Sequence, residues 1–199
     1  MRAAAIDQAK SRLKQAEDAL VALKAAKAVE DAEAAWTDYL VAAGTIYSKL
    51  EQGAKGSGTC EGWFGKKKKA RKDDQLLRYL HFARNSNEHG IERVVTTSAA
   101  NHHRGRPLAF NERIPVRIYP VDQATMAPLI GQSAEGVMAG PTLGPIRAHD
   151  RRYNDYCDPP TEHLSQPINF GGNFCYEVGA LGIEYLRGLI GEAEKLEPH

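Results

Sequence analysis

The six residues from Arg84 to His89 contain more potential catalytic groups than any other short stretch of the chain. They read Arg84-Asn85-Ser86-Asn87-Glu88-His89. An imidazole, with an unperturbed pKa of about 6.5, can donate or accept a proton at neutral pH. A planar guanidinium can neutralise charge on an oxyanion through two parallel hydrogen bonds. The cluster therefore indicates acid–base chemistry on an anionic substrate.

This cluster lies at the carboxyl end of a predicted amphipathic helix, residues 74–90. Asp73 or Asp74 can accept hydrogen bonds from the first free amides, and Gly90 suits the left-handed residue that ends a helix. At about 100° per residue, one broad apolar face contains Leu76, Leu77, Tyr79, Leu80 and Ala83. The opposite face carries Arg78, His81, Asn85 and His89.

Arg84 and His89 do not share a face of this helix. They are five residues apart, which is roughly 140° around a regular helix, so one straight helix does not direct both side chains at one phosphate. Either the helix unwinds before His89, as Gly90 permits, or a second chain completes the site. We favour the second alternative.

Positive charge is concentrated around this helix, although the formal net charge of the chain is only +1. Residues 66–106 hold 11 basic and 4 acidic side chains. Such a patch can concentrate a polyanion, although a solvated lysine loop is the simpler alternative. The candidate contacts to a polyanion are Lys66, Lys67, Lys68, Lys69, Arg71, Lys72, Arg78, His81, His102, His103 and Arg104.

The segment before the helix, residues 53–72, predicts a mobile loop. It contains five glycines and most of the basic run, and glycine clusters are typical of loops. Trp63 and Phe64 lie beside the lysines. These two aromatic side chains either stack on nucleobases or hold the loop against the core, and we favour the core.

Three further helices are predicted from apolar residues with 3–4 spacing, over residues 2–28, 30–53 and 173–197. A short link joins the first two, so they should form an antiparallel hairpin. Glycine is unfavourable inside a helix, and the last helix contains Gly179, Gly182, Gly188 and Gly191. We interpret these glycines as points of close approach to a neighbouring helix.

The middle of the chain lacks helical periodicity, and residues 91–99 and 113–121 predict strands. The fold class is therefore α+β. We expect an antiparallel four-helix bundle formed by residues 1–92 together with 173–199. A β-rich insertion, residues 93–172, separates helices three and four.

Arg84, the polar Asn85 and His89 resemble the signature of the HEPN superfamily. Its members are four-helix-bundle proteins, and many are ribonucleases. In the signature an arginine, usually followed by a polar residue, precedes a histidine by a spacing of four to six residues. The resemblance covers the predicted helices, and HEPN nucleases are typically dimers in which two copies of the motif face each other.

The resemblance implies a metal-independent endoribonuclease that uses no cofactor. The 2′-hydroxyl would attack the adjacent phosphorus and leave a cyclic phosphate and a free 5′-hydroxyl. His89 would act as general base or acid, and Arg84 would neutralise charge on the phosphoryl oxygens. Asn85 would orient the phosphate or the imidazole, and Glu88 would assist as a proton carrier. The implied partners are RNA, a second copy of the chain and, for a toxin or defence protein, an inhibitory protein.

Simpler interpretations of the cluster remain open. Arg84 and Glu88, four residues apart, can form an ordinary helix ion pair. His89 as a cation is favourable at a helix carboxyl terminus whether or not it does chemistry. The alternative function is then a non-enzymatic helical-bundle module, a degenerate HEPN domain, that docks a protein or nucleic-acid partner.

Other residues exclude several classes of site and protein. The spacing of His149, Cys157 and His163 fits no recognised zinc pattern, so no metal is predicted. The three cysteines lack CxxC pairing, which favours a reducing, cytoplasmic setting. No apolar run approaches the roughly 18 residues of a membrane span, so no membrane partner is expected.

Overall fold

The computed structural model describes residues 1–89, 94–129, 131, 133–150 and 154–196, and the side chains of Glu88 and His89 lie outside the described part. Within it, five helices and ten short strands confirm the predicted mixture of helix and strand. The helices are α1 (Ala3–Ala25), α2 (Val29–Ala54), α3 (Gly58–Asp73), α4 (Gln75–His89) and α5 (Phe174–Glu194). None of these helices is both long enough and apolar enough to cross a bilayer.

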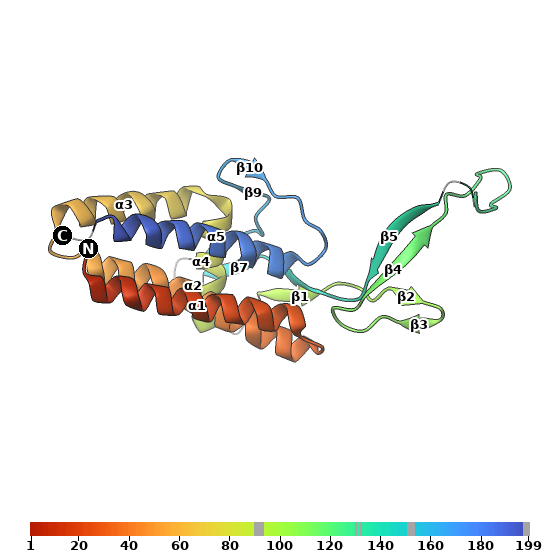
Figure 1. The fold of residues 1–199 in the computed structure, drawn as a ribbon, viewed down its shortest axis with the longest axis horizontal. Helices are drawn as coiled ribbons and strands as arrows, with labels where there is room; N and C mark the ends of the chain where they lie inside the picture. Colours follow the sequence, from red (N-terminus) through yellow and green to blue (C-terminus); the bar gives the residue numbers. More distant parts are fainter. Residues whose placement is uncertain (90–93, 130, 132, 151–153, 197–199) are drawn as a thin grey trace.

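The core of the helical body is centred on α2. Its side chains Trp36, Tyr39 and Leu40 are almost completely buried, and the rings of Trp36 and Tyr39 stack with centroids 5.1 Å apart. The alanine-rich α1 packs along the length of α2, and α5 lies against both (Figure 1). The predicted hairpin and the predicted last helix are therefore present.

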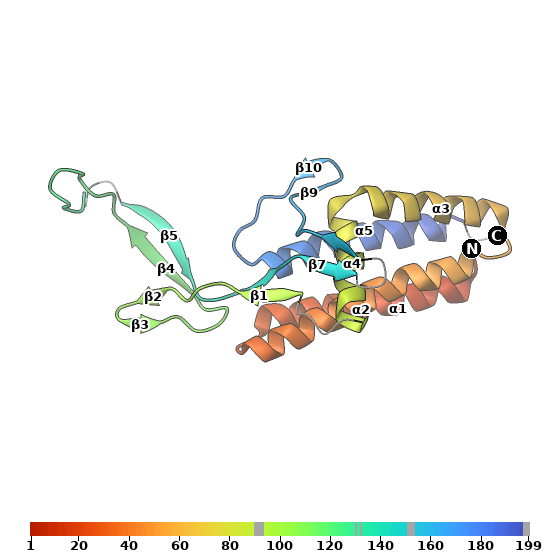
Figure 2. The ribbon, with the colours of Figure 1, turned by 180° about the vertical axis from the view of Figure 1, so that it is seen from behind.

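α4 is oriented differently from the other helices. Figures 1 and 2 show α1, α2, α3 and α5 extending along the long axis of the helical body, whereas α4 crosses it. The structure thus differs from the antiparallel four-helix arrangement that we predicted. The reason lies in the β-rich segment, which binds both ends of α4 through contacts that helical periodicity does not show.

The prediction of a mobile loop over residues 53–72 is wrong, because most of this segment forms α3. Ser57 caps the helix by accepting the N–H of Cys60 at 3.5 Å. The run of lysine, alanine and arginine that follows has high helix propensity and offsets the glycines. Cys60 and Phe64, four residues apart, are buried on one side of the helix.

Long-range contacts hold α3 against its neighbours. Trp63 donates its indole N–H to Glu192 of α5 at 3.1 Å, so this ring fixes the segment to the core as we favoured. Lys67 Nζ lies 2.6 Å from the same carboxylate, and Lys68 Nζ lies 2.9 Å from Glu51 of α2. These partners are far away in the sequence, which explains why local composition alone suggests a loop.

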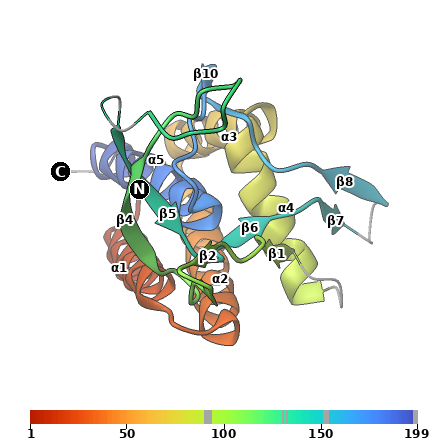
Figure 3. The ribbon, with the colours of Figure 1, turned by 90° about the vertical axis from the view of Figure 1, so that its right-hand side faces the viewer.

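Three antiparallel strand pairs lie beside the helices. They are β1 (Val95–Thr97) with β6 (Leu143–Pro145), β7 (Ala148–Asp150) with β8 (Asp155–Cys157), and β9 (Glu162–His163) with β10 (Gln166–Pro167). α4 contacts β7, β8 and β9, and Figure 3 shows β7 and β8 next to this helix. The predicted strand over 91–99 includes β1, although residues 91–93 lie outside the described part.

Two further pairs project away from the helices (Figure 1). β2 (His102–His103) and β3 (Arg106–Pro107) form a hairpin whose turn residues, Arg104 and Gly105, have φ values of 51° and 80°. β4 (Arg113–Ile118) and β5 (Ala134–Ala139) form a longer hairpin, here called the β4–β5 arm. The register of the arm pairs apolar residues on one face, Ile114 with Met138, Val116 with Gly136, and Ile118 with Ala134.

Replacement of residues 115–137 by a short Gly-Ser turn is expected to leave the helical body folded. The strands of the arm pair mainly with each other, and an isolated two-stranded hairpin is at best marginally stable in water. The free energy of unfolding should therefore change by less than about 1 kcal/mol, as measured by urea denaturation. A loss above about 3 kcal/mol would show that the arm stabilises the helices.

Candidate functional site

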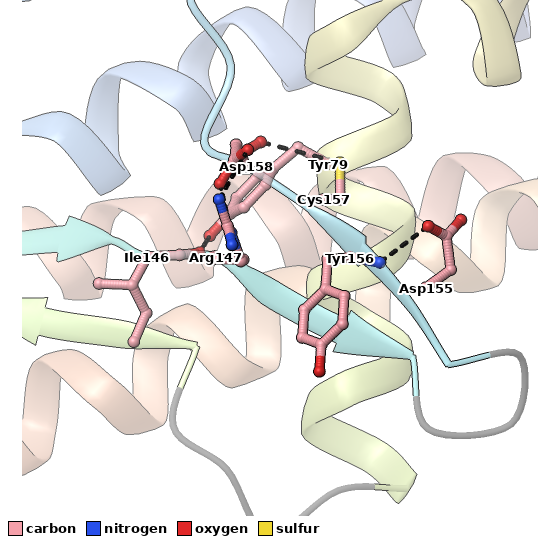
Figure 4. A network of polar contacts seen from close by, with 7 residues as sticks. All are labelled: Tyr79, Ile146, Arg147, Asp155, Tyr156, Cys157 and Asp158. Carbon is pink, nitrogen blue, oxygen red and sulfur yellow. Dashed lines mark hydrogen bonds and ion pairs between the residues drawn. The ribbon is translucent and has the colours of Figure 1, made fainter.

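The middle of α4 is fixed by a buried tyrosine. The Tyr79 hydroxyl lies 2.9 Å from the carbonyl oxygen of Ile146 and 3.3 Å from that of Val94. Burial raises the pKa of Tyr79, so its hydroxyl remains a donor. Figure 4 shows Tyr79 and Ile146 together with the neighbouring Arg147–Asp158 ion pair, in which Arg147 Nε lies 2.6 Å from Asp158. The helix is thus attached to the strands through its core-facing side.

Both ends of α4 are also attached to the β-rich segment. At the carboxyl end, the buried Ser86 hydroxyl accepts the N–H of His149 at 2.9 Å and donates to the carbonyl of the same residue. At the amino end, the Asp74 carboxylate accepts the N–H groups of Leu77 and Leu164 at 2.9 and 2.7 Å. It also lies 3.0 Å from Nδ1 of His163. These contacts set the direction in which the polar face of α4 points.

An Asp74→Asn variant is expected to be less stable than the wild type at neutral pH. Burial raises the pKa of Asp74, but hydrogen bonds from Leu164, Leu77 and His163 outweigh burial, and the net shift is below the ordinary value of 3.8. This contribution is therefore complete above about pH 4 and is lost as the pH falls through the folded-state pKa. The asparagine should cost roughly 1–2 kcal/mol at pH 7 and weaken the acid dependence.

Urea denaturation between pH 2 and 7 measures the effect of this substitution. Asp73→Asn is the matched control, because Asp73 is exposed and precedes the capping position. Equal losses in the two variants, or an unchanged acid dependence for Asp74→Asn, would contradict the assignment.

A pocket of about 410 Å³ opens beside the polar face of α4. The carboxyl end of α3 forms one wall, α4 a second, and the β7–β8 hairpin a third. The pocket is lined by Arg71, Lys72, Arg78, His81, Phe82, Asn85, Asp150 and Asp155. Five of the predicted site residues thus meet in one place, although they come from two helices.

Arg71 is the most unusual side chain of the pocket. It is half-buried, and its guanidinium lies over the Tyr47 ring, 4.5 Å from the centroid. Its Nε atom is buried and, in the part of the chain that the structure describes, has no hydrogen-bond partner. Burial lowers the pKa of Arg71, yet a guanidinium keeps its charge in proteins.

His81 lies in the same pocket as a neutral imidazole. Burial, followed by the positive charges of Arg71 and Arg84, lowers the pKa of His81 to about 4, against the opposing effect of Asp150. At neutral pH the ring therefore carries no charge and can accept a proton or a hydrogen bond. Of the charged groups that shift this pKa, the three cations Arg71, Arg84 and Lys72 lower it, and Asp150 raises it.

Arg84 and Asn85 lie on different sides of α4, and Arg84 is not one of the residues that line the pocket. The stem of Arg84 packs on α2 at Gly44, where an added Cβ would lie 3.0 Å from the Arg84 Cδ atom. Asn85 lines the pocket, and its Oδ1 atom lies 3.4 Å from Nη1 of Arg84. The two residues are thus close enough to contact one ligand.

The remaining catalytic candidates, Glu88 and His89, have side chains outside the described part. The backbone of α4 is nevertheless helical through His89. The alternative in which the helix unwinds before His89 is therefore wrong.

The other predicted polyanion contacts do not reach the pocket. Lys67 and Lys68 form the ion pairs with α5 and α2 given above, whereas Lys66 and Lys69 are exposed on α3. The β2–β3 hairpin carries His102, His103 and Arg104 and lies beyond β1, away from α4 (Figure 1). The basic residues of the sequence therefore divide into separate groups in space.

The residues of the rejected zinc pattern have other contacts. The His149 ring stacks on Tyr156 with centroids 4.3 Å apart, His163 binds Asp74, and Cys157 is buried. Among the described residues, no three His, Cys, Asp or Glu side chains are grouped closely enough to hold a metal ion.

Asp150, Asp155 and Phe82 were missing from the predicted site. The Arg78 guanidinium carbon lies over the Phe82 ring, 5.4 Å from the centroid of the ring. Asp155 lies 3.5 Å from the same guanidinium. Asp150 and Asp155 come from the insertion, more than sixty residues beyond α4 in the chain. No local pattern in the sequence indicates that contact.

Comparison of the chain with protein-family models, with curated proteins and with solved structures finds no match.

Proposed function

We propose that the protein is a metal-independent endoribonuclease whose reacting groups lie in the carboxyl-terminal half of α4. The observation that carries this proposal is the placement of Arg84 and Asn85 beside a pocket lined by Arg71, Lys72 and Arg78. A guanidinium next to a cationic pocket suits the phosphodiester backbone of RNA.

The proposed reaction is an internal transfer at phosphorus. A general base removes the proton of the 2′-hydroxyl, and the oxygen attacks the adjacent phosphorus while the bond to the 5′-oxygen breaks. A general acid returns a proton to that oxygen, so the products are a 2′,3′-cyclic phosphate and a 5′-hydroxyl. Arg84 stabilises the charge that grows on the phosphoryl oxygens, Asn85 orients the phosphate, and His89 transfers the proton, with Glu88 as a further proton carrier.

A second copy of the chain is part of the proposal. α4 continues as a helix through His89, and residues five apart on a helix point in different directions. Two α4 helices facing each other would place Arg84 of one copy near His89 of the other. The oligomeric state in solution, measured by sedimentation, tests this arrangement.

The proposal extends the resemblance to HEPN ribonucleases. It is supported by an arginine followed by a polar residue near the end of a helix. That helix, α4, packs in a helical body that also contains α1, α2 and α5. Two features, the additional helix α3 and the crossing of α4, depart from the bundle that we predicted.

The test is cleavage of a mixed RNA by the purified protein in the presence of EDTA. The wild type should cut the RNA, and His89→Ala should be about 10²–10⁴-fold slower. Arg12→Ala is a control, because Arg12 lies on α1 and, within the described part of the chain, hydrogen-bonds only the exposed Gln15. An inactive wild type, or His89→Ala with unchanged activity, overturns the proposal.

A non-enzymatic docking module is the second candidate. It is favoured by the β4–β5 arm, where Ile118 and Val137 are 54% and 57% exposed and project from the helices. Exposed apolar surface of this kind marks interaction sites, and a protein partner, including an inhibitor of a nuclease, would cover it. Binding of RNA without cleavage by the wild type would favour this candidate.

A further inference from the structure

We propose that the pocket between α3, α4 and the β7–β8 hairpin is a binding site for a phosphate-type oxyanion, with Arg71 as its principal ligand. The proposal deepens the proposed function, because an RNA phosphate flanking the cleaved bond would occupy the site. Its chemistry is nevertheless shared by free phosphate, a nucleotide and RNA. It can therefore be tested separately from cleavage.

The guanidinium of Arg71 has the properties of an oxyanion ligand. A charge taken even partly out of water is costly unless it is paired. Arg71 is half-buried, forms no ion pair within 4 Å among the described residues, and its Nε has no acceptor there. Stacking on Tyr47 fixes the plane of the guanidinium. A fixed guanidinium with unused donors matches the bidentate geometry of a phosphate group.

Arg71 lines two neighbouring cavities. An inner cavity of about 30 Å³ is lined mainly by apolar residues of α2, α4 and α5 and shares Arg71 and His81 with the 410 Å³ pocket. The inner cavity is about large enough for one water molecule. The outer pocket has the volume of a small-ligand site, so an anion reaches Arg71 from that side.

The charged side chains around the pocket favour an anion at its α3–α4 end. Lys72 of α3, Arg78 of α4 and the nearby Arg84 add to the charge of Arg71, whereas Asp150 and Asp155 line the opposite wall. Asp155 already lies 3.5 Å from Arg78. Positive charge therefore exceeds negative charge at the α3–α4 end, which is where an oxyanion would bind.

Binding should be linked to the protonation of His81. The cations of α3 and α4 disfavour a charged imidazole, and Asp150 is the opposing group. A bound dianion would offset those cations and raise the pKa of His81. A proton is then taken up on binding, and affinity should increase as the pH falls from 7 toward the free-state pKa.

The experiment uses sulfate first, because sulfate remains a dianion throughout the pH range of the measurement. Nuclear magnetic resonance follows the His81 imidazole of the full-length wild type with and without saturating sulfate. The pKa of His81 is expected to rise by about 1 to 3. Calorimetry with inorganic phosphate, a nucleoside monophosphate and a 2′-deoxy oligonucleotide, which cannot react, then identifies the preferred source of the oxyanion.

Arg71→Met removes the guanidinium and keeps an unbranched side chain beside Tyr47. It should weaken binding of each probe at least about tenfold and abolish the effect of sulfate on His81. Arg12→Met is the matched control. Lys72→Met, at an exposed position, provides a second variant that should weaken binding severalfold even if Arg71→Met does not fold.

Two results would overturn the site. One is the absence of sulfate and phosphate binding by the wild type at millimolar concentration. The other is unchanged binding by Arg71→Met or, if that variant is unfolded, by Lys72→Met. Loss of RNA cleavage in His89→Ala with oxyanion binding intact separates the two proposals. Oxyanion binding by a wild type that does not cut RNA refutes only the nuclease.

Discussion

An Arg84→Gln variant is expected to cleave RNA about 10²–10³-fold more slowly than the wild type. The stem of Arg84 packs against Gly44, and glutamine retains much of that stem and one amide donor. The substitution therefore removes mainly the positive charge and the second parallel hydrogen bond. Single-turnover cleavage of a defined RNA with EDTA present measures the loss, since it reports the chemical step and not product release.

Arg84→Lys distinguishes charge from geometry in the same assay. Lysine keeps the charge but cannot form the bidentate contact, so its rate should lie between those of the wild type and Arg84→Gln. Arg12→Gln controls for the loss of any single arginine. If Arg84→Gln retains the wild-type rate, Arg84 does not stabilise the transition state.

Gly182→Ala is expected to lower the free energy of unfolding by up to about 2 kcal/mol. An added Cβ would lie 2.2 Å from the Tyr39 hydroxyl oxygen and 2.9 Å from Leu80 Cδ1. Tyr39 is completely buried, so the close packing around it resists its displacement. Overpacking of this kind costs about 1–3 kcal/mol, which exceeds the gain of about 1 kcal/mol in helix propensity.

Gly188→Ala in the same helix is the matched control. Apart from its own helix backbone and chain neighbours, no atom of the described residues lies within 4 Å of a Cβ added at Gly188. Only the propensity gain then remains, and the variant should be about 0.5–1 kcal/mol more stable. Urea denaturation compares the two variants directly. Equal stability of Gly182→Ala and Gly188→Ala would contradict the close approach of α5 to α2 and α4.

The glycines of α5 show how much of the helix packing could be predicted from the sequence. We attributed all four to close approach between helices. The structure supports this for Gly179, where an added Cβ would lie 2.5 Å from Leu20 Cδ2, and for Gly182. Gly188 and Gly191 have open space instead. Composition identifies a helix with unusual glycines but does not reveal which of them meet a neighbour.

The helices with strong apolar periodicity were predictable, and α3 was not. α1, α2, α4 and α5 each bury a continuous stripe, so their sequences carry the 3–4 pattern. α3 buries only Cys60 and Phe64. Its other contacts are ion pairs with distant carboxylates, the Trp63–Glu192 hydrogen bond and the stacking of Arg71 on Tyr47. A helix stabilised in this way has almost no local signal.

The candidate site was predictable only for its residues on α3 and α4. The helical wheel placed Arg78, His81 and Asn85 on one face, and they line one pocket. The third wall comes from the β7–β8 hairpin, which meets α4 through the Ser86–His149 contact. Pairing between segments so far apart in the chain is set by tertiary packing and not by local pattern.

Cleavage of a chimeric oligonucleotide tests the central claim most directly. The substrate is a DNA strand with a single ribonucleotide, so only one position has a 2′-hydroxyl, and EDTA is present throughout. The account predicts one cut, directly 3′ of the ribonucleotide, with a 2′,3′-cyclic phosphate on one product and a 5′-hydroxyl on the other, identified by mass spectrometry. Cuts at deoxyribonucleotides, products with a 3′-hydroxyl and 5′-phosphate, or no cut by a protein that binds the strand would contradict it.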